Sequence, residues 1–222
     1  MNNHIRNLKT LFIKNLWLSI PLIVLNVFLI YNSVIHFSKN NVELPDVEVD
    51  NGTIKNSVFH NKYLNWTFKI PSEYSVTPIS EIDRVSKIGN GLLQNENNIN
   101  TPIRLLNIST ETVDMMSNLN PRVLYPHLTT EDKYFEEIDN RFGNLANHSI
   151  TVDKINQGAL LIDRLQFKYV EYVLTNQKGQ VGMMFLSRFN KDYMFDISLT
   201  YKNTQDALYL INKLKDSELD WK

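Results

Sequence analysis

The segment Tyr193-Met-Phe-Asp-Ile-Ser-Leu-Thr-Tyr201 decides the fold class, because aromatic and aliphatic side chains occupy every second position in it. Asp196, Ser198 and Thr200 fill intervening positions and are polar. An alternation with period two is the pattern of a β-strand that buries one face. We therefore expect a strand over 192–201 with its apolar positions in the core.

Further strands are predicted directly before this one, and a helix after it. The strands are expected at 149–155, 159–174 and 180–189, with breaks at Asn156–Gly158, Asn176–Gly179 and Asn190–Asp192. The helix is expected from Thr204 to about Ser217, where Ala207, Leu208, Ile211 and Leu214 form an apolar stripe. Consecutive hairpins followed by a covering helix favour an α+β domain, with helices packed on an antiparallel sheet.

The residues before these hairpins contain shorter signals. Tyr63–Ile70 alternates well enough to predict a strand that ends at Pro71, and a short strand begins near Tyr74. We expect a helix from Ser80 to Gly91 and a strand over Ile103–Ser109. A weak helix is predicted over Thr110–Asn118, and a stronger one over Thr130–Phe142, which carries apolar residues at helical spacing.

Near the N-terminus, residues 15–37 carry no charged side chain and are mostly apolar, which predicts a transmembrane anchor. Trp17 and Tyr31 suit the two membrane interfaces. Residues 1–14 contain Arg6, Lys9 and Lys14, whereas the predicted linker at 38–56 is acidic. The positive-inside rule therefore predicts a cytoplasmic segment 1–14 and an extracytoplasmic domain at 57–222.

Two alternatives to this anchor stay open. A cleaved signal peptide would need small residues after the apolar run, and Ile35-His36-Phe37-Ser38-Lys39 does not provide them. A buried helix of a soluble protein is the other alternative. The uncleaved anchor places the protein, as a single-pass chain, in a bacterial inner or plasma membrane, where 15–37 contacts lipid.

A family resemblance follows from two segments and the helix after them. Phe68-Lys-Ile-Pro-Ser-Glu-Tyr74, followed later by Tyr193–Tyr201 and the helix at 204–217, resembles the PsbP-like domains, which include DcrB-type envelope proteins. The resemblance covers 57–222 and implies a central antiparallel sheet sandwiched by helices. It implies an accessory or binding role and no shared catalytic site.

The chain departs from this family at two points. Tyr74 stands where the family usually has Trp, and the lipoprotein cysteine of the bacterial relatives is missing. The second departure suggests that the helix at 15–37 replaces a lipid as the tether.

Composition excludes several classes of function. The net charge of −1 argues against a nucleic-acid partner, and the lack of cysteine excludes thiolate metal sites, Cys nucleophiles and disulfides. No glycine-rich phosphate loop and no Gly-x-Ser-x-Gly motif occurs. The five histidines have no metal-site spacing; they are His4, His36, His60, His127 and His148. We therefore expect no catalytic, cofactor-binding or metal-binding residues and no cofactor.

Three sets of residues have the chemistry of a possible site. The acidic segment Glu131–Asp139 is interpreted as a solvated helical face rather than a carboxylate pair or a calcium site. Most of six tyrosines on strands are interpreted as packing residues rather than one ligand groove: Tyr63, Tyr74, Tyr169, Tyr172, Tyr193 and Tyr201. The four Asn-x-Ser/Thr sequons, at Asn51, Asn65, Asn107 and Asn147, are expected by chance in this Asn-rich chain.

The expectation for function is a non-enzymatic module that binds an envelope protein outside the cytoplasm. Two alternatives remain: a domain that binds a small ligand or lipid, and an enzyme whose site is scattered through the sequence.

Overall fold

The computed structural model describes residues 49–82, 102–145, 150–177 and 179–221. The predicted anchor at 15–37, most of the linker at 38–56 and most of the predicted helix at 80–91 lie outside these ranges, although 79–82 are helical. Within the described ranges, no helix is both long and apolar enough to cross a membrane.

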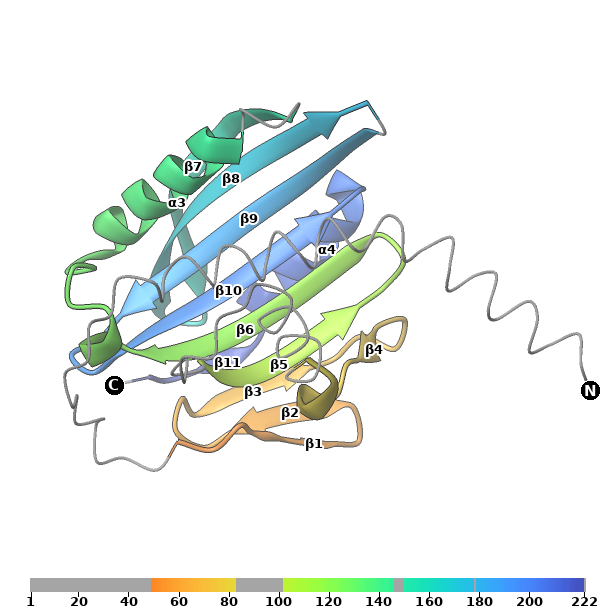
Figure 1. The fold of residues 1–222 in the computed structure, drawn as a ribbon. Coiled ribbons are helices and arrows are strands. Elements are labelled where there is room, and N and C mark those ends of the chain that lie inside the picture. Colours follow the sequence, from red (N-terminus) through yellow and green to blue (C-terminus); the bar gives the residue numbers. More distant parts are fainter. Residues whose placement is uncertain (1–48, 83–101, 146–149, 178, 222) are drawn as a thin grey trace, which may run out of the picture. The chain divides into compact units, whose positions relative to one another are not determined.

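A seven-stranded antiparallel sheet forms the centre of the described structure (Figure 1). Its strand order is β4-β5-β6-β10-β9-β8-β7, so β10 lies in the middle between β6 and β9. The strands are β4 (Ser75–Val76), β5 (Ile103–Ser109), β6 (Val113–Pro121), β7 (Thr151–Ile162), β8 (Leu165–Asn176), β9 (Gly179–Phe189) and β10 (Tyr193–Tyr201).

A second, four-stranded sheet has the order β1-β2-β3-β11. It contains β1 (Thr53–Lys55), β2 (Val58–Asn61), β3 (Trp66–Lys69) and β11 (Glu218–Leu219). β1 lies within the segment predicted as a linker, and β11 pairs with β3, so the C-terminal end of the described chain joins the N-terminal strands.

Helices lie on both sides of the large sheet (Figure 1). α3 (Glu131–Leu145) packs on the side that carries Phe185, because Phe142 and Phe185 have ring centroids 5.9 Å apart. α4 (Thr204–Lys215) and the small sheet pack on the opposite side, which carries Phe195. A short 3-10 helix, η1 (Arg122–Leu124), follows β6. The predicted α+β class with an antiparallel sheet is confirmed.

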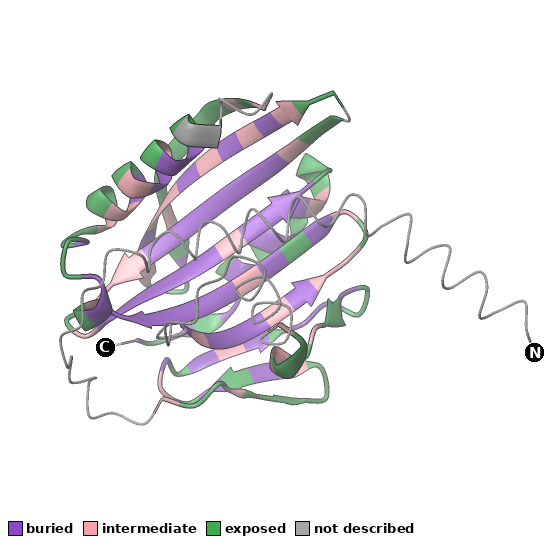
Figure 2. Cartoon of the chain, in the orientation of Figure 1, coloured by how far each residue is buried: buried purple, intermediate pink, exposed green. Residues whose placement is uncertain are grey.

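The core between the two sheets is aromatic. Trp66 of β3 is buried, with its ring centroid 5.1 Å from Phe59 and 5.4 Å from Phe195. Trp221 contacts the same Phe195 ring edge to face at 6.0 Å. β9 and β10 are buried along most of their lengths (Figure 2), as expected for central strands with a layer on each face.

The predicted helix at Thr110–Asn118 is wrong, because this segment lies mostly in β6. Val113, Met115 and Leu119 are buried at alternate positions, and β6 pairs with β5 on one side and with β10 on the other. Hydrogen bonding to two neighbouring strands overrides the weak helical pattern of the local sequence.

The predicted strand break at Asn156–Gly158 is also wrong. β7 continues through it with a bulge between Lys154 and Asn156, because β8 supplies a partner for the ladder along the whole segment. The turn comes after Ile162 instead, where Asp163 has φ of 51°. The predicted strand at 159–174 therefore spans a hairpin turn.

The apolar stripe predicted for the last helix is wrong at Leu208, which is 47% exposed, while Leu210 is buried in its place. The remaining elements agree with the sequence patterns. The turns at Asn176–Gly179 and Asn190–Asp192, the strand at Ile103–Ser109, and the helices beginning near Thr130 and Thr204 are confirmed within a few residues. The strand expected over Tyr63–Ile70 is shorter than predicted, since β3 begins at Trp66 and Asn65 has φ of 46°.

Candidate functional site

A buried carboxyl group, that of Asp196 on β10, lies on the α3 side of the large sheet. Asn118 of β6 is directly opposite it in the ladder, and its Nδ2 donates a hydrogen bond to Asp196 Oδ2 at 3.2 Å. The Nδ2 of Asn120 donates to Asp196 Oδ1. Asp196 is 9% exposed, so both carboxylate oxygens are bonded inside the protein.

The alternation of β10 explains how this carboxyl comes to be buried. Phe195 and Ile197 face the core between the two sheets, and Asp196 therefore faces the other way. The sequence correctly separates these two sets of side chains. The sequence gives no sign that the second face is also covered, and Asp196 therefore cannot be recognised as a candidate site residue from the sequence.

Burial raises the pKa of Asp196 to about 7. The amide of Asn118, the positive charge of Arg104 and the amide of Asn120 act in the opposite direction but do not offset the loss of hydration. Asp196 is therefore a group that binds or releases a proton near neutral pH.

Two tyrosines and Arg104 lie within electrostatic range of this carboxyl, and Arg141 lies within range of the two tyrosines. Burial, together with the charge of Asp196, raises the pKa of Tyr125 to about 12 and that of Tyr134 well above its usual value. Arg141 of α3 is buried, and its Nε and Nη2 donate to Glu137 Oε1 at 3.0 and 2.7 Å. Arg104 on β5 is also buried.

Ser187 of β9 lies directly opposite Asp196 on the other side of the ladder. Its Oγ is buried and has no hydrogen-bond partner among the described residues, and the same holds for Asn118 Oδ1. A serine without a bonded base is not an activated nucleophile. The group around Asp196 therefore provides one titrating carboxyl, which accepts hydrogen bonds from the amides of Asn118 and Asn120.

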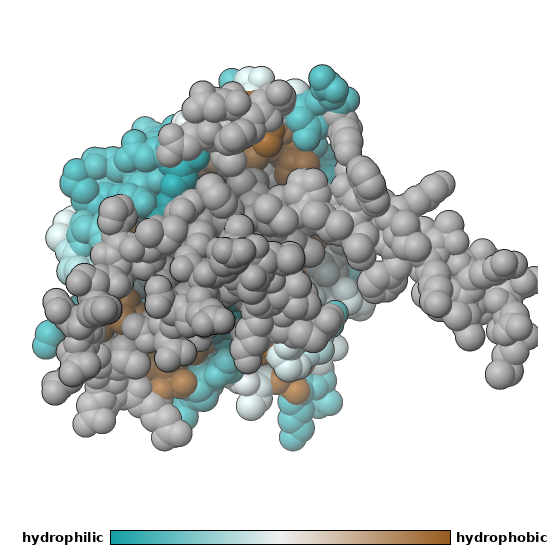
Figure 3. Space-filling view, viewed as in Figure 1, coloured by the Kyte–Doolittle hydropathy of each residue, from teal (hydrophilic) through white to brown (hydrophobic). Residues whose placement is uncertain are grey.

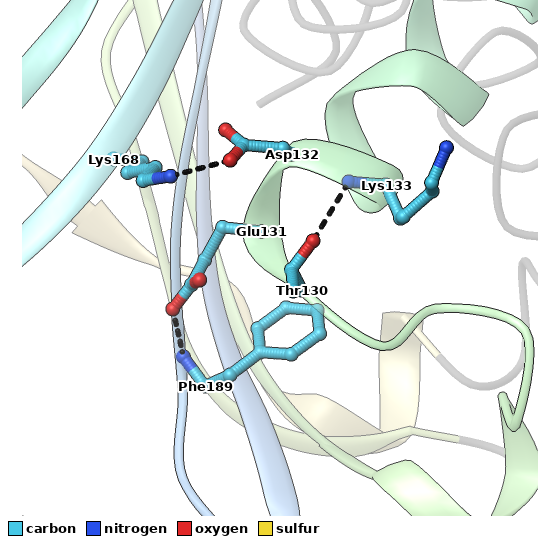
Figure 4. A network of polar contacts seen from close by, with 6 residues as sticks. All are labelled: Thr130, Glu131, Asp132, Lys133, Lys168 and Phe189. Carbon is cyan, nitrogen blue, oxygen red and sulfur yellow. Dashed lines mark hydrogen bonds and ion pairs between the residues drawn. The ribbon is translucent and has the colours of Figure 1, made fainter.

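Residues of the acidic segment Glu131–Asp139 bond the N-terminal end of α3 to the large sheet (Figure 4). Glu131 Oε1 accepts from the backbone N–H of Phe189 at 2.9 Å, and Asp132 is 2.7 Å from Lys168 Nζ on β8. Thr130 Oγ1 accepts from the Lys133 N–H at 3.3 Å, so it satisfies one of the free donors of the first turn.

Further along α3, Asp139 contacts two strands. Its Oδ2 is 2.9 Å from Lys154 Nζ on β7, and its Oδ1 accepts from the Tyr172 hydroxyl at 2.5 Å. The solvated-face interpretation holds for Lys133 and Glu136, which are exposed and paired, and the outer surface of α3 is hydrophilic (Figure 3). It is wrong for Glu131 and Asp139, which are half-buried and bond to the sheet, whereas Asp132 bonds to the sheet but stays exposed.

The histidines and tyrosines do not converge on one place. His60 Nδ1 is 3.1 Å from Thr67 Oγ1, and His127 is exposed, while His4, His36 and His148 lie outside the described residues. In the described ranges no group of three His, Asp or Glu side chains is arranged to hold a metal ion. The packing interpretation of the tyrosines is confirmed for the buried ones: Tyr74, Tyr172, Tyr193 and Tyr201.

A small hollow of about 280 Å³ lies beside the small sheet, away from Asp196. Asp50, His60, Lys62 and Asn65 contribute to its polar lining. It includes the sequon residue Asn65, which is exposed in a turn. Asn51 and Asn107 are also described, and Asn147 lies outside the described ranges.

The most open part of the large sheet is its edge strand β7. Among the described strands β7 pairs with β8 alone, and nine of its twelve residues are exposed, including all from Asp153 to Ala159. Natural proteins usually shorten, charge or cover such edges, because unpaired N–H and C=O groups pair readily with another strand. β7 is long and contains no proline.

Comparisons with known proteins give only distant similarities. No protein-family model matches the chain, and no curated protein does. The solved structures that are similar to it include cyanobacterial PsbP (CyanoP) of Synechocystis sp. PCC 6803, at 10% identity and a TM-score of 0.45, with 83% of this chain and 99% of that chain covered. The apo immunity protein TplEi of a type VI secretion system of Pseudomonas aeruginosa is similar at 10% identity and a TM-score of 0.40, with 87% and 82% covered.

Both similarities are too distant to carry an argument about function or family. The structure supports the α+β class, and membership of the PsbP-like superfamily stays a prediction.

Proposed function

We propose that this chain is a non-enzymatic, single-pass membrane protein whose extracytoplasmic α+β domain binds another envelope protein. The sequence supports the location, because residues 15–37 are uncharged and the cations of 1–14 precede an acidic linker at 38–56. In this proposal the domain lies outside the cytoplasm. A binding role is also what the resemblance to PsbP-like domains implies.

The exposed edge strand β7 is the observation that carries the binding role. An extended segment of a partner adds to such an edge as a further strand: main-chain hydrogen bonds supply affinity and neighbouring side chains supply specificity. Ile155 and Leu161, 52% and 59% exposed, are the most exposed large hydrophobic residues among those described, and both lie on β7. The edge therefore presents apolar contacts as well as backbone groups.

Site-specific crosslinking in native membranes tests this role. A photoreactive residue replaces Gln157 on β7 in the full chain, and another replaces Leu208, which is 47% exposed on α4 and serves as the control position. We expect one recurrent protein partner from position 157 and none from position 208. Adding Leu161→Lys to the β7 probe should abolish that product, because the charge lies at the contact. A product that forms equally at both positions, or that survives Leu161→Lys, overturns the proposal.

A separate experiment tests the topology. A reporter that works only outside the cytoplasm is fused after Lys222, and we expect it to be active. Activity of a cytoplasmic reporter at the same position would overturn the orientation while leaving the binding edge to be judged by the crosslinks.

A further inference from the structure

We infer that the strand that pairs with β7 is β7 of a second copy of this chain, in an antiparallel arrangement related by a two-fold axis at Gly158. This inference rests on the proposed function, because it uses the same edge and names the partner. A second copy carries the same predicted anchor and is itself an envelope protein.

The first support is that the exposed edge of β7 is complementary to the same edge of a second copy. A two-fold axis makes an interface self-complementary, so each residue of one copy meets a defined residue of the other. An antiparallel pairing centred on Gly158 sets Gln157 opposite Ala159 and Ile155 opposite Leu161. The two most exposed large hydrophobic residues then cover each other, twice per dimer, as apolar cross-strand pairs.

Neighbouring registers do not achieve this. Centring the pairs on Gln157 sets Leu161 opposite Asp153, and centring them on Asn156 sets it opposite Thr151. Only the Gly158 register places Ile155 and Leu161 opposite each other. The residues paired in it, 154–162, contain one charged side chain, Lys154, which is already bound to Asp139 of α3.

The geometry of the strand agrees with this centre. The bulge between Lys154 and Asn156 leaves Ile155 without a partner on β8, whereas the residues from 156 to 162 pair regularly with β8. The centre of the proposed pairing, 156–160, is therefore regular strand in each copy, and Ile155 meets Leu161 from the bulge at its end. Asp153 would fall opposite Asp163, but Asp163 lies in the turn beyond the strand, and its Oδ2 accepts a hydrogen bond from Leu219 N at 3.1 Å. The like charges are therefore outside the ladder.

Engineered disulfides test the register directly, because the chain has no cysteine of its own. In the full chain in native membranes, the double variant Gln157→Cys/Ala159→Cys places a thiol pair directly opposite across the two-fold axis. We expect it to form covalent dimers on mild oxidation. Gln157→Cys alone should not exceed the background measured with Leu208→Cys, since two residues on the diagonal are about 7–8 Å apart, beyond disulfide reach.

Self-association of the purified full chain in detergent gives a second measurement. Leu161→Lys should weaken dimerisation roughly tenfold or more, because a lysine takes the place of an apolar partner in both symmetric pairs. Leu208→Lys, with similar exposure on α4, should leave it unchanged.

The outcomes separate the two proposals. A monomeric chain whose Gln157 probe captures a different protein in a Leu161-dependent way overturns the inference and supports the proposed function. A monomeric chain without β7-dependent capture overturns both. Dimers that form as readily with Gln157→Cys alone, or with Leu208→Cys, overturn the two-fold axis at Gly158.

Discussion

The ring of Tyr201 lies across the α-carbon of Gly182, the residue directly opposite it in the ladder between β9 and β10. A side chain at position 182 would occupy the space of this ring, since an added Cβ meets three of its atoms. The Tyr201 hydroxyl donates to Glu171 on β8, so this one side chain joins three adjacent strands. The glycine is required here for close approach, and its φ is not positive.

Gly182→Ala should therefore destabilise the domain by about 1–3 kcal/mol, the usual cost of forcing extra atoms into a packed site. Gly143→Ala is the matched control, because Gly143 is exposed in α3 and an added Cβ there meets nothing within 4 Å. Alanine is the better helix former, so Gly143→Ala should stabilise by about 0.5–1 kcal/mol. Urea denaturation of the two variants gives the comparison, and equal stability of both would contradict the packing argument.

Asp196 should make the stability of the domain depend on pH. Its pKa rises from 3.8 to about 7 on burial, so the folded state binds the proton more tightly than the unfolded chain. Its contribution is fully present below pH 3.8 and is lost as the pH rises through 7. Since one pH unit corresponds to about 1.4 kcal/mol, the loss is on the order of 4 kcal/mol.

Asp196→Asn should remove this dependence. Its amide stays neutral, and Asn118 can rotate its side-chain amide to accept from it, since Asn118 Oδ1 has no other partner in the described part of the chain. The measurement is the difference in unfolding free energy between wild type and variant at pH 5 and pH 8. The unfolding free energy of the variant should rise relative to that of the wild type as the pH increases. A difference that is the same at both pH values would refute the titration of Asp196 in this range.

Trp66 and Ser217 should be energetically coupled. Trp66 Nε1 donates to Ser217 Oγ at 3.2 Å, and this hydroxyl donates to Leu214 O at 2.7 Å, which connects β3 to the end of α4. Ser217→Ala leaves the buried indole N–H unpaired and should cost about 1–3 kcal/mol. Adding Trp66→Phe removes that donor, so the double variant should cost less than the sum of the single variants in a thermodynamic cycle. Strict additivity would show that the bond contributes nothing.

Asn203 should stabilise α4 as its N-cap. Its side chain accepts from the N–H of Gln205 at 2.9 Å, in an extended backbone conformation suited to a cap. Asn203→Ala should cost about 1 kcal/mol, whereas Asn203→Asp should retain most of the stability because its carboxylate accepts the same hydrogen bond. Thermal unfolding of the three proteins is the measurement. A loss with Asp as large as that with Ala would exclude the cap.

Local patterns were sufficient where apolar side chains recur at a regular spacing along one face of an element. The strand at Tyr193–Tyr201 and the helix at Thr204–Lys215 follow directly from apolar side chains at periods of two and 3.6. They were insufficient at Thr110–Asn118 and Asn156–Gly158, where pairing with neighbouring strands decides the structure.

The candidate site could not be predicted for the same reason. Asp196, Asn118 and Ser187 belong to three strands, and only the β6-β10-β9 order brings them together. Each of them alone is an ordinary polar residue at an alternate strand position. The exposed edge of β7 was equally hidden, since exposure at an edge depends on which strand has a partner on one side only.

The sequence by itself therefore determined the α+β class and most of the apolar faces of its main elements, because these depend on side chains close together along the chain. The anchor at 15–37 stays a prediction. The tertiary structure alone decided that β10 lies at the centre and β7 at the edge, and that the polar face around Asp196 is buried. The physical reason is that burial and pairing arise from strands distant in sequence, and no local pattern records which strands will become neighbours.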